Sequence, residues 1–399
     1  MTGIRHTSLA IHHSETISRV GIVLRQRLSS VPRQGWQHIV ESQGMHYHTL
    51  EGQPYWDESA YYSFTRAEID GIEKATYDLN DMCVKAVDHV VEQRLFGQFG
   101  IPAAFVDWVI ESWEHDEQTI YGRFDFSCDG AEPPKLLEYN ADTPTALLEA
   151  SVIQWFWLKQ TRPEADQFNS IHERLIEAWK VLAQQEEKRI HFASLRGNLE
   201  DYMTVNYLRD TAMQAGLQTE FLHVEDIGWN QRQSAFVDLH EQPIATLFKL
   251  YPWEWMLKDQ FGPHLLTSRT RWLEPPWKMI PSNKAILAVL WELFPESPYL
   301  LQAAFEPFGS TYIKKPLQGR EGCNVTLVFD GAAVLETEGT YGEGPWVYQE
   351  VRPLPKYDGN YPVIGSWLVN GYACGLGIRE DNQPITQNTS RFVPHVFVR

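Results

Sequence analysis

The stretches Tyr121-Gly-Arg-Phe-Asp-Phe126 and Leu137-Glu-Tyr-Asn-Ala-Asp142 decide the fold that we expect for this chain of 399 residues. Each reads as a β-strand that carries two strongly polar groups two positions apart. Asp129-Gly130 lies between them and is typical of a tight turn, so we expect the two strands to form a hairpin. Such a hairpin would bring the polar groups of both strands together.

These polar groups are typical of a magnesium and phosphate site. Because successive side chains of a strand alternate between faces, Arg123 and Asp125 share one face, and Glu138 and Asn140 share another. Carboxylate and amide oxygens suit Mg²⁺, and an arginine beside them suits a phosphate. The two strands therefore indicate an enzyme that uses a magnesium-bound nucleotide.

Composition limits the class of protein. The chain is 43% hydrophobic and 22% charged, which is ordinary for a globular protein with a large core. A formal net charge of -18 argues against a nucleic-acid or anionic-membrane surface, because phosphates need a basic field. Four widely spaced cysteines without C-x-x-C do not indicate a zinc site or a disulfide framework. The N-terminus lacks an apolar signal region and the longest apolar run is too short to span a bilayer, so we expect a cytoplasmic protein.

Helix and strand signals alternate through the middle of the chain. The capping box Thr65-Arg-Ala-Glu68 opens a long helix, and Ser170-Ile-His-Glu173 repeats that device. A strand at 190–194, a helix from about 200 to 215 and a strand at 219–224 form a strand–helix–strand unit, which is usually parallel. The unit has no G-x-G-x-x-G, so the dinucleotide fingerprint is absent.

The last hundred residues are dominated by strands. We expect them at 312–315, 324–329, 332–336, 346–351, 363–369 and 372–379, with Asp330-Gly331 and Asn370-Gly371 as hairpin turns. A strand at 244–250 and a helix at 284–294 precede them. The predicted fold is α+β (mixed α/β), with interlocked lobes and a C-terminal antiparallel sheet.

The segment Ile313-Lys-Lys-Pro-Leu-Gln-Gly-Arg-Glu-Gly-Cys-Asn324 is a candidate phosphate loop. Its glycines would let backbone N–H groups close around phosphate oxygens, and a lysine would neutralise them. The P-loop pattern G-x-x-x-x-G-K-[ST] is absent. On its own the loop fits an ordinary β-connection, and Lys314 and Lys315 fit a solvated strand end equally well.

Five motifs together resemble the synthetase domain of glutathionylspermidine synthases, which are ATP-grasp-type carbon–nitrogen ligases. In chain order they are Tyr121-Gly-Arg-Phe-Asp-Phe, Leu137-Glu-Tyr-Asn-Ala-Asp-Thr-Pro-Thr, Ser282-Asn-Lys-Ala-Ile-Leu, Lys315-Pro-Leu-Gln-Gly-Arg-Glu-Gly-Cys-Asn and Tyr348-Gln349. The resemblance runs from about Gly44 to the C-terminus. It implies an ATP-grasp-like ligase domain at residues 44–399, preceded by an N-terminal segment at residues 1–43.

The resemblance implies roles for the two polar strands. Asp125, Glu138 and Asn140 correspond to Mg²⁺ ligands, with two ions expected. Arg123 corresponds to the catalytic arginine that holds the transferring phosphate and the developing acyl phosphate, because a guanidinium stabilises spread negative charge.

The resemblance also implies a set of ATP-binding residues: Arg123, Lys284, Lys315, Gly319, Gly322, Gln349 and Arg379. The lysines and Arg379 correspond to groups that contact phosphates, and Gln349 lies in the adenine-binding segment. The loop 319–322 would close over the nucleotide and exclude water, which would hydrolyse an acyl phosphate. By pattern alone, Lys284 fits a solvated helix start and Arg379 fits a surface residue.

Thr143, Glu200 and Asp201 are the candidate substrate residues. Thr143 lies in the segment that helps to seat the thiol peptide in the family, and the two acids lie near its polyamine-binding carboxylates. Acids at a helix N-terminus also favour the helix dipole, so both interpretations of Glu200 and Asp201 stay open. The segment 141–149 is less polar here than in the polyamine enzymes, and the chain most resembles stand-alone members without the amidase domain. Reverse hydrolysis is therefore not expected, and neither the acid nor the amine is identified.

We therefore expect an ATP- and Mg²⁺-dependent ligase. It would activate a peptide-like carboxylate as an acyl phosphate and condense it with an amine to form an amide. Two alternatives stay open: a nucleotide-binding regulatory or scaffold protein derived from such a ligase, and a phosphotransferase that stops at a phosphorylated product. ATP binding without turnover would indicate the former, and a phosphorylated product without an amide would indicate the latter.

Overall fold

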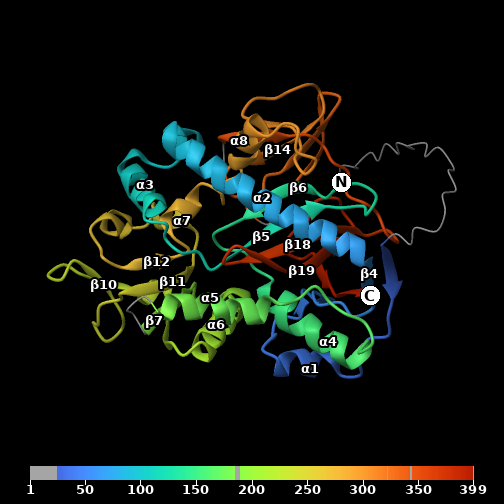
Figure 1. The fold of residues 1–399 in the computed structure, drawn as a ribbon, viewed down its shortest axis with the longest axis horizontal. Helices are drawn as coiled ribbons and strands as arrows, with labels where there is room; N and C mark the ends of the chain where they lie inside the picture. The colour runs from blue at the N-terminus through green and yellow to red at the C-terminus, as the bar shows by residue number, and fades with distance from the viewer. Residues whose placement is uncertain (1–24, 185–188, 321, 342–343, 399) are drawn as a thin grey trace, which may run out of the picture.

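The computed structural model describes residues 25–184, 189–320, 322–341 and 344–398. At its centre lies an antiparallel sheet in the order β20-β19-β18-β5-β6, formed by Arg391–Val393, Tyr372–Asp381, Tyr361–Val369, Tyr121–Ser127 and Lys135–Asn140. The predicted hairpin is confirmed, because β5 pairs with β6. Its partners on the other side come from the C-terminal part of the chain (Figure 1).

One face of this sheet is packed against the long helix α2 (Arg66–Glu92), which crosses it in Figure 1. Every second residue of β5 points to that side, so Phe124 and Phe126 join the buried core that contains Ile72 of α2. The helix begins as predicted: Thr65 and Glu68 form a reciprocal capping box. Because α2 covers the apolar face, the polar residues of β5 and β6 are left on the opposite face.

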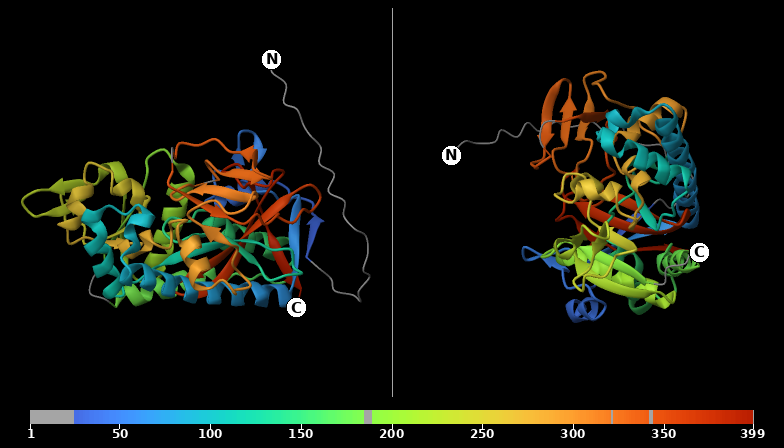
Figure 2. Two further views of the ribbon diagram at one scale, coloured as in Figure 1. Left: turned by 90° about the horizontal axis from the view of Figure 1, so that it is seen from above. Right: turned by 90° about the vertical axis from the view of Figure 1, so that its left-hand side faces the viewer.

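A second antiparallel sheet lies beyond that polar face (Figure 2). Its order is β13-β17-β14-β15-β16, from Ala303–Ala304, Trp346–Gln349, Tyr312–Pro316, Thr326–Phe329 and Ala332–Glu336. The helix α8 (Ile286–Leu293) packs against β13 and β17. The predicted turns at Asp330-Gly331 and Asn370-Gly371 are confirmed by positive φ angles at all four residues.

A parallel sheet forms a separate part of the fold. Its order is β12-β11-β7-β8, from Arg271–Leu273, Thr246–Leu250, Arg189–Ser194 and Gln218–His223. The strand–helix–strand prediction is confirmed, because β7 and β8 are parallel and α6 (Leu199–Gln214) connects them. The helix α5 (Ile171–Ala183) packs against α6.

Ser170 is the N-cap residue of α5, but the capping box predicted there is wrong. The Ser170 hydroxyl makes no capping bond and instead donates to the carbonyl oxygen of Cys374 at 3.3 Å. The backbone N–H of Ser170 donates to the same oxygen at 2.7 Å. A tertiary bond to β19 has therefore replaced the local one.

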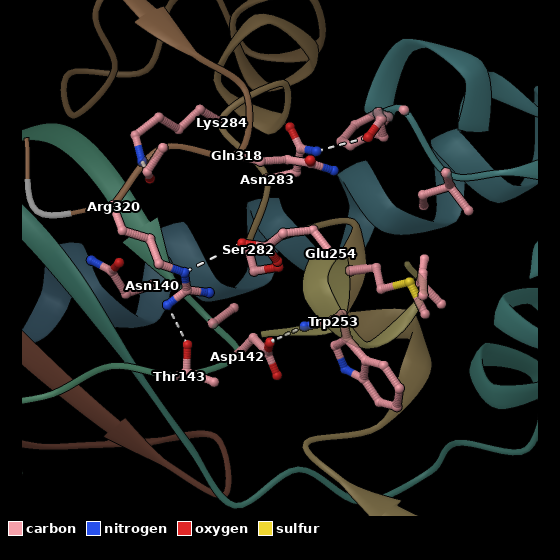
Figure 3. Close-up of a pocket in the computed structure, with 17 residues that line it drawn as sticks. Asn140, Asp142, Thr143, Trp253, Glu254, Ser282, Asn283, Lys284, Gln318 and Arg320 are labelled. Carbon is pink, nitrogen blue, oxygen red and sulfur yellow. Dashed lines mark hydrogen bonds and ion pairs between the residues drawn. The ribbon is translucent and has the colours of Figure 1, made fainter. Parts of the chain in front are cut away.

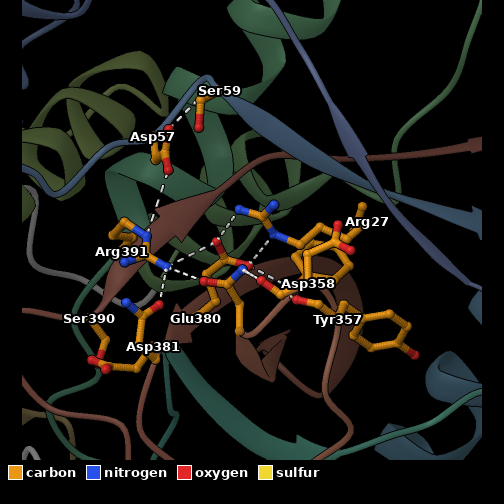
Figure 4. A network of polar contacts seen from close by, with 12 residues as sticks. Arg27, Asp57, Ser59, Tyr357, Asp358, Glu380, Asp381, Ser390 and Arg391 are labelled. Atoms are coloured by element: carbon orange, nitrogen blue, oxygen red, sulfur yellow. Dashed lines mark hydrogen bonds and ion pairs between the residues drawn. The ribbon is translucent and has the colours of Figure 1, made fainter.

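The ends of the described chain meet in a small sheet of order β1-β4-β21, formed by Gln26–Ser29, Ala60–Thr65 and His395–Val398. Buried Glu380 of β19 ties this sheet to the central one (Figure 4). Its carboxylate accepts two bonds from Arg27 at 2.9 and 2.7 Å and one from the Tyr62 hydroxyl at 2.6 Å. Because β1 precedes residue 44 and is part of this network, residues on both sides of the predicted domain boundary belong to one body. The boundary itself stays a prediction, and residues 1–24 lie outside the described part.

Short elements complete the fold. The hairpins are β2–β3 and β9–β10, formed by Thr49–Leu50, Gln53–Pro54, Gly228–Asn230 and Ala235–Val237. The α-helices are α1, α3, α4 and α7 at Trp36–Ser42, Val106–Glu114, Gln154–Thr161 and Trp253–Met256. The turn η3 (Glu149–Ile153) is a π-helix that runs directly into α4, and the 3₁₀ turns are η1, η2, η4, η5 and η6 at Leu95–Phe99, Ala103–Phe105, Val224–Asp226, Gly262–Leu266 and Pro276–Met279. Within the described residues, no helix is both long enough and apolar enough to cross a membrane.

Candidate active site

The polar groups of β5 and β6 meet on the uncovered face of the central sheet. Arg123 lies opposite Asn140 and Asp125 lies opposite Glu138 in the antiparallel register. The Asn140 amide nitrogen donates to Asp125 Oδ2 at 3.1 Å and to Glu138 Oε1 at 3.2 Å. The four side chains predicted from alternation therefore form one cluster.

Arg123 is held rigidly within this cluster. Its Nε and Nη2 atoms donate to the two carboxylate oxygens of Asp125 at 2.6 and 2.9 Å, and Nη1 donates to the carbonyl oxygen of Thr145 at 2.6 Å. Burial disfavours the charge of Arg123, but Asp125 outweighs burial and raises the arginine's pKa. Burial also raises the pKa of Asp125, although Arg123 opposes that shift.

The arginine lies directly over Gly365 of β18, which pairs with Asp125. A Cβ atom added to Gly365 would lie 2.7 Å from Cδ of Arg123. This glycine is therefore required for the close approach of the guanidinium to the sheet.

Two lysines from distant segments complete the cluster. Lys284 Nζ lies 3.0 Å from Glu138 Oε2, and Lys315 of β14 donates a 3.0 Å hydrogen bond to the carbonyl oxygen of Leu137, the residue before Glu138. Burial would raise the pKa of Glu138, but the charges of Lys284 and Lys315 outweigh it and lower that pKa to about 2. Burial lowers the pKa of Lys315 to about 8, against the attraction of Glu138.

Gln349 lies deeper than the other predicted residues. It is 1% exposed, and its amide accepts from Lys315 Nζ at 2.7 Å and donates to the Leu136 carbonyl at 3.0 Å. Gln349 therefore fixes the ammonium group of Lys315 and does not line the cleft. Its predicted adenine contact stays a prediction.

A cleft of about 190 Å³ lies between the two antiparallel sheets, and the polar groups of β5 and β6 line it together with Lys284 and Lys315. Among the described residues the cleft presents two carboxylates, Asp125 and Glu138, against six cationic side chains: Arg123, Lys284, Lys315, Arg320, Arg352 and Arg379. Leu137, Ile313, Val325, Leu354 and Val363 form an apolar part of the lining. The cleft thus combines an anion-binding region with an apolar region, inside a protein whose net charge is -18.

The glycine loop lies at this cleft, and its predicted closure over a nucleotide stays a prediction. Gly319 and Gly322 both line it, and Gly322 has a φ of +69°. A Cβ atom on Gly322 would lie 2.4 Å from the carbonyl oxygen of Thr386, so the loop packs tightly against the segment after β19. Glu321, inside the loop, lies outside the described residues.

Arg320 of the same loop crosses to the end of the hairpin (Figure 3). Its guanidinium donates to the Thr143 hydroxyl, and its Nε lies 3.3 Å from Glu254 Oε1. A smaller cavity of about 40 Å³ begins beyond this contact and shares Asn140, Thr143 and Lys284 with the larger cleft. No role was predicted for Arg320, although its position between the two glycines was a signal.

Arg379 also lines the cleft, on the β19 side. Its Nη2 donates to the Gln387 carbonyl, and its buried Nε has no hydrogen-bond partner among the described residues. The remaining donor capacity points to an anion as its partner.

Glu200 and Asp201 do not line the cleft. The charge of Glu200, however, affects the pKa of a buried carboxyl group, Glu149, that was not predicted from the sequence. Glu149 of η3 is fully buried, and its Oε1 accepts a 2.8 Å bond from the Tyr55 hydroxyl. Burial and then the charge of Glu200 raise the pKa of Glu149 to about 7. The backbone N–H of Asp201 donates to the N-cap residue Asn198. The sequence around Glu149 is apolar on all sides and gave no signal for it.

The donor set fits a magnesium ion. Mg²⁺ usually binds one or two carboxylates and completes its shell with water and substrate phosphates. Asp125 and Glu138, joined by the amide of Asn140, offer such a set. No group of three or more His, Cys, Asp or Glu side chains suited to a metal exists in the described part of the chain.

The similarity of this chain to known proteins shows the family to which it belongs. The sequence pattern of the family described as "Glutathionylspermidine synthase preATP-grasp" matches residues 27–398. The chain belongs to the glutathionylspermidine synthase family. The resemblance predicted from the five motifs is therefore confirmed.

Among the relatives of this family member, the Haemophilus influenzae protein named "Putative acid--amine ligase" is 44% identical over 373 residues, which are 89% of this chain and 95% of that protein. Trypanothione synthetase of Crithidia fasciculata is 30% identical over 349 residues, 79% of this chain and 53% of the relative. The bifunctional glutathionylspermidine synthetase/amidase of Escherichia coli is 29% identical over 377 residues, 86% of this chain and 60% of the relative. The expected enzyme class, a carbon–nitrogen ligase, is confirmed by these names.

A solved structure shares the fold. The apo form of a glutathione synthetase-like effector from Globodera pallida superposes with a TM-score of 0.56 at 9% identity, covering 91% of this chain and 96% of the effector. The mixed α+β architecture predicted from the sequence is confirmed.

Proposed function

We propose that this protein is an ATP- and Mg²⁺-dependent ligase of ATP-grasp type that activates a carboxylate as an acyl phosphate and condenses it with an amine. The observation that carries the proposal is the excess of cationic side chains in the cleft of a strongly acidic protein. A polyphosphate is the anion that six buried or half-buried cations would match. The apolar lining beside them suits a nucleotide base.

The ion pairs of the cluster suggest how Mg²⁺ and phosphate would be bound together. Arg123 is paired with Asp125, and Lys284 is paired with Glu138. On binding, both carboxylates would exchange their cationic partners for the metal, while Arg123 and Lys284 would turn to the phosphates. A half-turn of the Asn140 amide would present its oxygen as a further ligand, and two ions could share these donors.

Arg123 is the residue that we expect to act in the phosphoryl transfer. A carboxylate oxygen of the substrate attacks the γ-phosphorus, and the bond to the β-phosphate oxygen breaks to release ADP. Mg²⁺, when bound, offsets the charge of the phosphates during this in-line transfer. The planar guanidinium of Arg123 would stabilise the equatorial oxygens, and its hydrogen bond to the Thr145 carbonyl would keep it aligned after Asp125 has turned to the metal.

The acid substrate would approach from the smaller cavity. Thr143 and Arg320 separate that cavity from the cleft, and Arg320 offers a guanidinium for a second carboxylate of a peptide-like acid. Gly319 and Gly322 allow the same loop to close over the acyl phosphate and exclude water.

Ala146 lines the cleft and Glu149 follows it in the same segment, so we place the approach of the amine on this side of the cleft. A buried carboxyl group with a pKa near 7 and a second acid, Glu200, nearby form an environment that attracts an ammonium ion and can accept its proton. The amine nitrogen then attacks the carbonyl carbon, phosphate leaves, and the amide forms. Four free cysteines agree with the reducing cytoplasm as the compartment.

A direct test is positional isotope exchange in ATP labelled with ¹⁸O at the β–γ bridge. With Mg²⁺ and a suitable acid but no amine, reversible formation of an acyl phosphate should scramble the label, and hydroxylamine should trap a hydroxamate. The acid for this experiment is found first, by screening a panel of small peptides for those that cause ADP release.

The matched variants are Asp125→Asn and Asp70→Asn. We expect Asp125→Asn to lower the exchange by at least about 10²-fold, because it removes a proposed metal ligand. Asp70 pairs with Arg66 on the exposed face of α2, so its variant should behave as wild type. ADP release without scrambling or hydroxamate would contradict the acyl phosphate, and ATP binding without turnover on any acid and amine would indicate the scaffold alternative.

A further inference from the structure

A second cavity lies away from the ATP cleft, among α1, α4, α5 and α6. These helices gather at the end of the molecule opposite α8 and β14 (Figure 1). The cavity measures about 530 Å³, a size typical of small-molecule sites. It shares no lining residue with the ATP cleft among the described residues.

Two helix faces form its walls. Met203, Tyr207 and Asp210 follow one another at helical spacing along α6. Leu148, Val152 and Trp155 do the same along η3 and α4 on the other side. Helical residues therefore form both walls, and Gln43, Gly44 and Asn169 complete the lining from outside the helices.

Aromatic surface is exposed at the mouth of the cavity. Trp155 and Phe156 form an edge-to-face pair with ring centroids 4.9 Å apart, yet they are 40% and 37% exposed. Lys159 Nζ already lies 5.6 Å from the centroid of the Trp155 ring. This ring therefore presents a surface that attracts cations.

The cavity is lined by two acids and one histidine, His172, and Lys159 lies outside the lining against the Trp155 ring. Glu173 and Asp210 line it, and its lining contains neither lysine nor arginine among the described residues. Asp210 accepts a hydrogen bond from Gln214 at 2.8 Å, but within the described chain neither acid forms an ion pair. An anionic ligand would be repelled, whereas an organic cation would meet two carboxylates and three aromatic rings.

We propose that this cavity is a second ligand site, which binds an organic ammonium ion with an aliphatic body. The charged head would lie between Asp210, Glu173 and the face of Trp155. The aliphatic body would lie along Leu148, Val152 and Met203. The site requires neither ATP nor Mg²⁺.

The test uses hexyltrimethylammonium, which has no N–H bond and so cannot be the amine that is acylated. Isothermal titration of the full chain without ATP should show saturable, one-to-one binding, and hexanoate should not bind. We expect Asp210→Asn and Trp155→Ala each to weaken binding by at least about fivefold. Both residues are exposed, so the variants should fold, and thermal unfolding is the measurement that checks this.

Two control variants locate the site. Glu177→Gln lies one turn along α5 outside the cavity and pairs with Arg174, so it should keep wild-type affinity. Asp125→Asn in the ATP cleft should also keep it. No saturable binding by the wild type, wild-type affinity in both Asp210→Asn and Trp155→Ala, or loss of binding in Asp125→Asn would each overturn the proposal.

Discussion

Replacing Gly365 by alanine should disable the active site without removing any of its functional groups. The new Cβ atom would lie 2.7 Å from Arg123 Cδ and 3.2 Å from its Nε. Carbon atoms in contact normally lie about 3.5–4.0 Å apart, so Arg123 would have to move by about 1 Å. Its hydrogen bonds to Asp125 and to the Thr145 carbonyl resist that movement.

The expected loss of activity follows from this displacement. Misplacing a reacting group by about 1 Å costs on the order of 10²-fold in rate, and overpacking a tight site costs about 1–3 kcal/mol of stability. The assay is kcat for ADP release, with thermal unfolding measured in parallel. Gly71→Ala is the matched control, because a Cβ atom on this exposed glycine of α2 would meet nothing within 4 Å. The control should keep full activity and gain about 0.5–1 kcal/mol.

A double-mutant cycle shows whether Gly365→Ala lowers activity by displacing Arg123. In an Arg123→Ala background, Gly365→Ala should cause little further loss, because the clash is gone. Full activity of Gly365→Ala on the wild-type background, or an equal loss on both backgrounds, would refute the reasoning.

Three further variants test other parts of the structure. Since the pKa of Glu149 is raised to about 7, the charged form of this carboxyl group destabilises the folded state. The free energy of unfolding, measured by urea titration, should therefore fall by up to roughly 3 kcal/mol as the pH rises from about 4.5 to 7. Glu149→Gln should make the free energy of unfolding less dependent on pH in this range. Glu380→Leu should lower the free energy of unfolding by about 3 kcal/mol, because the half-buried Arg27 would lose the carboxylate with which it pairs. Arg27→Met in the same background should recover part of the loss, and no recovery would contradict the ion-pair account. Lys284→Met should raise the KM for ATP by at least about tenfold, because it removes a cation, 3.0 Å from Glu138, that we propose to bind phosphate. An unchanged KM would show that the lysine is not part of the nucleotide site.

The sequence predicted best those features that depend on local periodicity. The shared faces of Arg123 with Asp125 and of Glu138 with Asn140 follow from strand alternation, and the hairpin turn set their register. The positions of Lys284 and Lys315 beside Glu138 could not follow from pattern. They depend on how a helix start and a strand from distant segments pack, and only the family resemblance indicated them.

The residues that were missed share a physical reason. Glu149 lies in an apolar run in which four of the five residues of η3 are buried, so periodicity could not show that its carboxylate points inward. Gly365 looks like any strand glycine until the side chain above it is known. Ser170 was predicted to form a capping box because local bonding patterns ignore competing tertiary acceptors such as the Cys374 carbonyl.

The pairing of β5 with β18 has a consequence for how this protein is made. Residues 121–127 reach their partner at 361–369 only after most of the chain has left the ribosome. Until then, one edge of the nascent β5 has no partner strand, and Arg123 and Asp125, which are buried in the folded protein, are exposed. An unpaired strand edge of this kind is prone to pair with the wrong strand or chain. Folding of the catalytic sheet should therefore be slow and late, with chaperones protecting the early hairpin. A chain arrested before residue 361 should remain inactive, however well its parallel sheet has already formed.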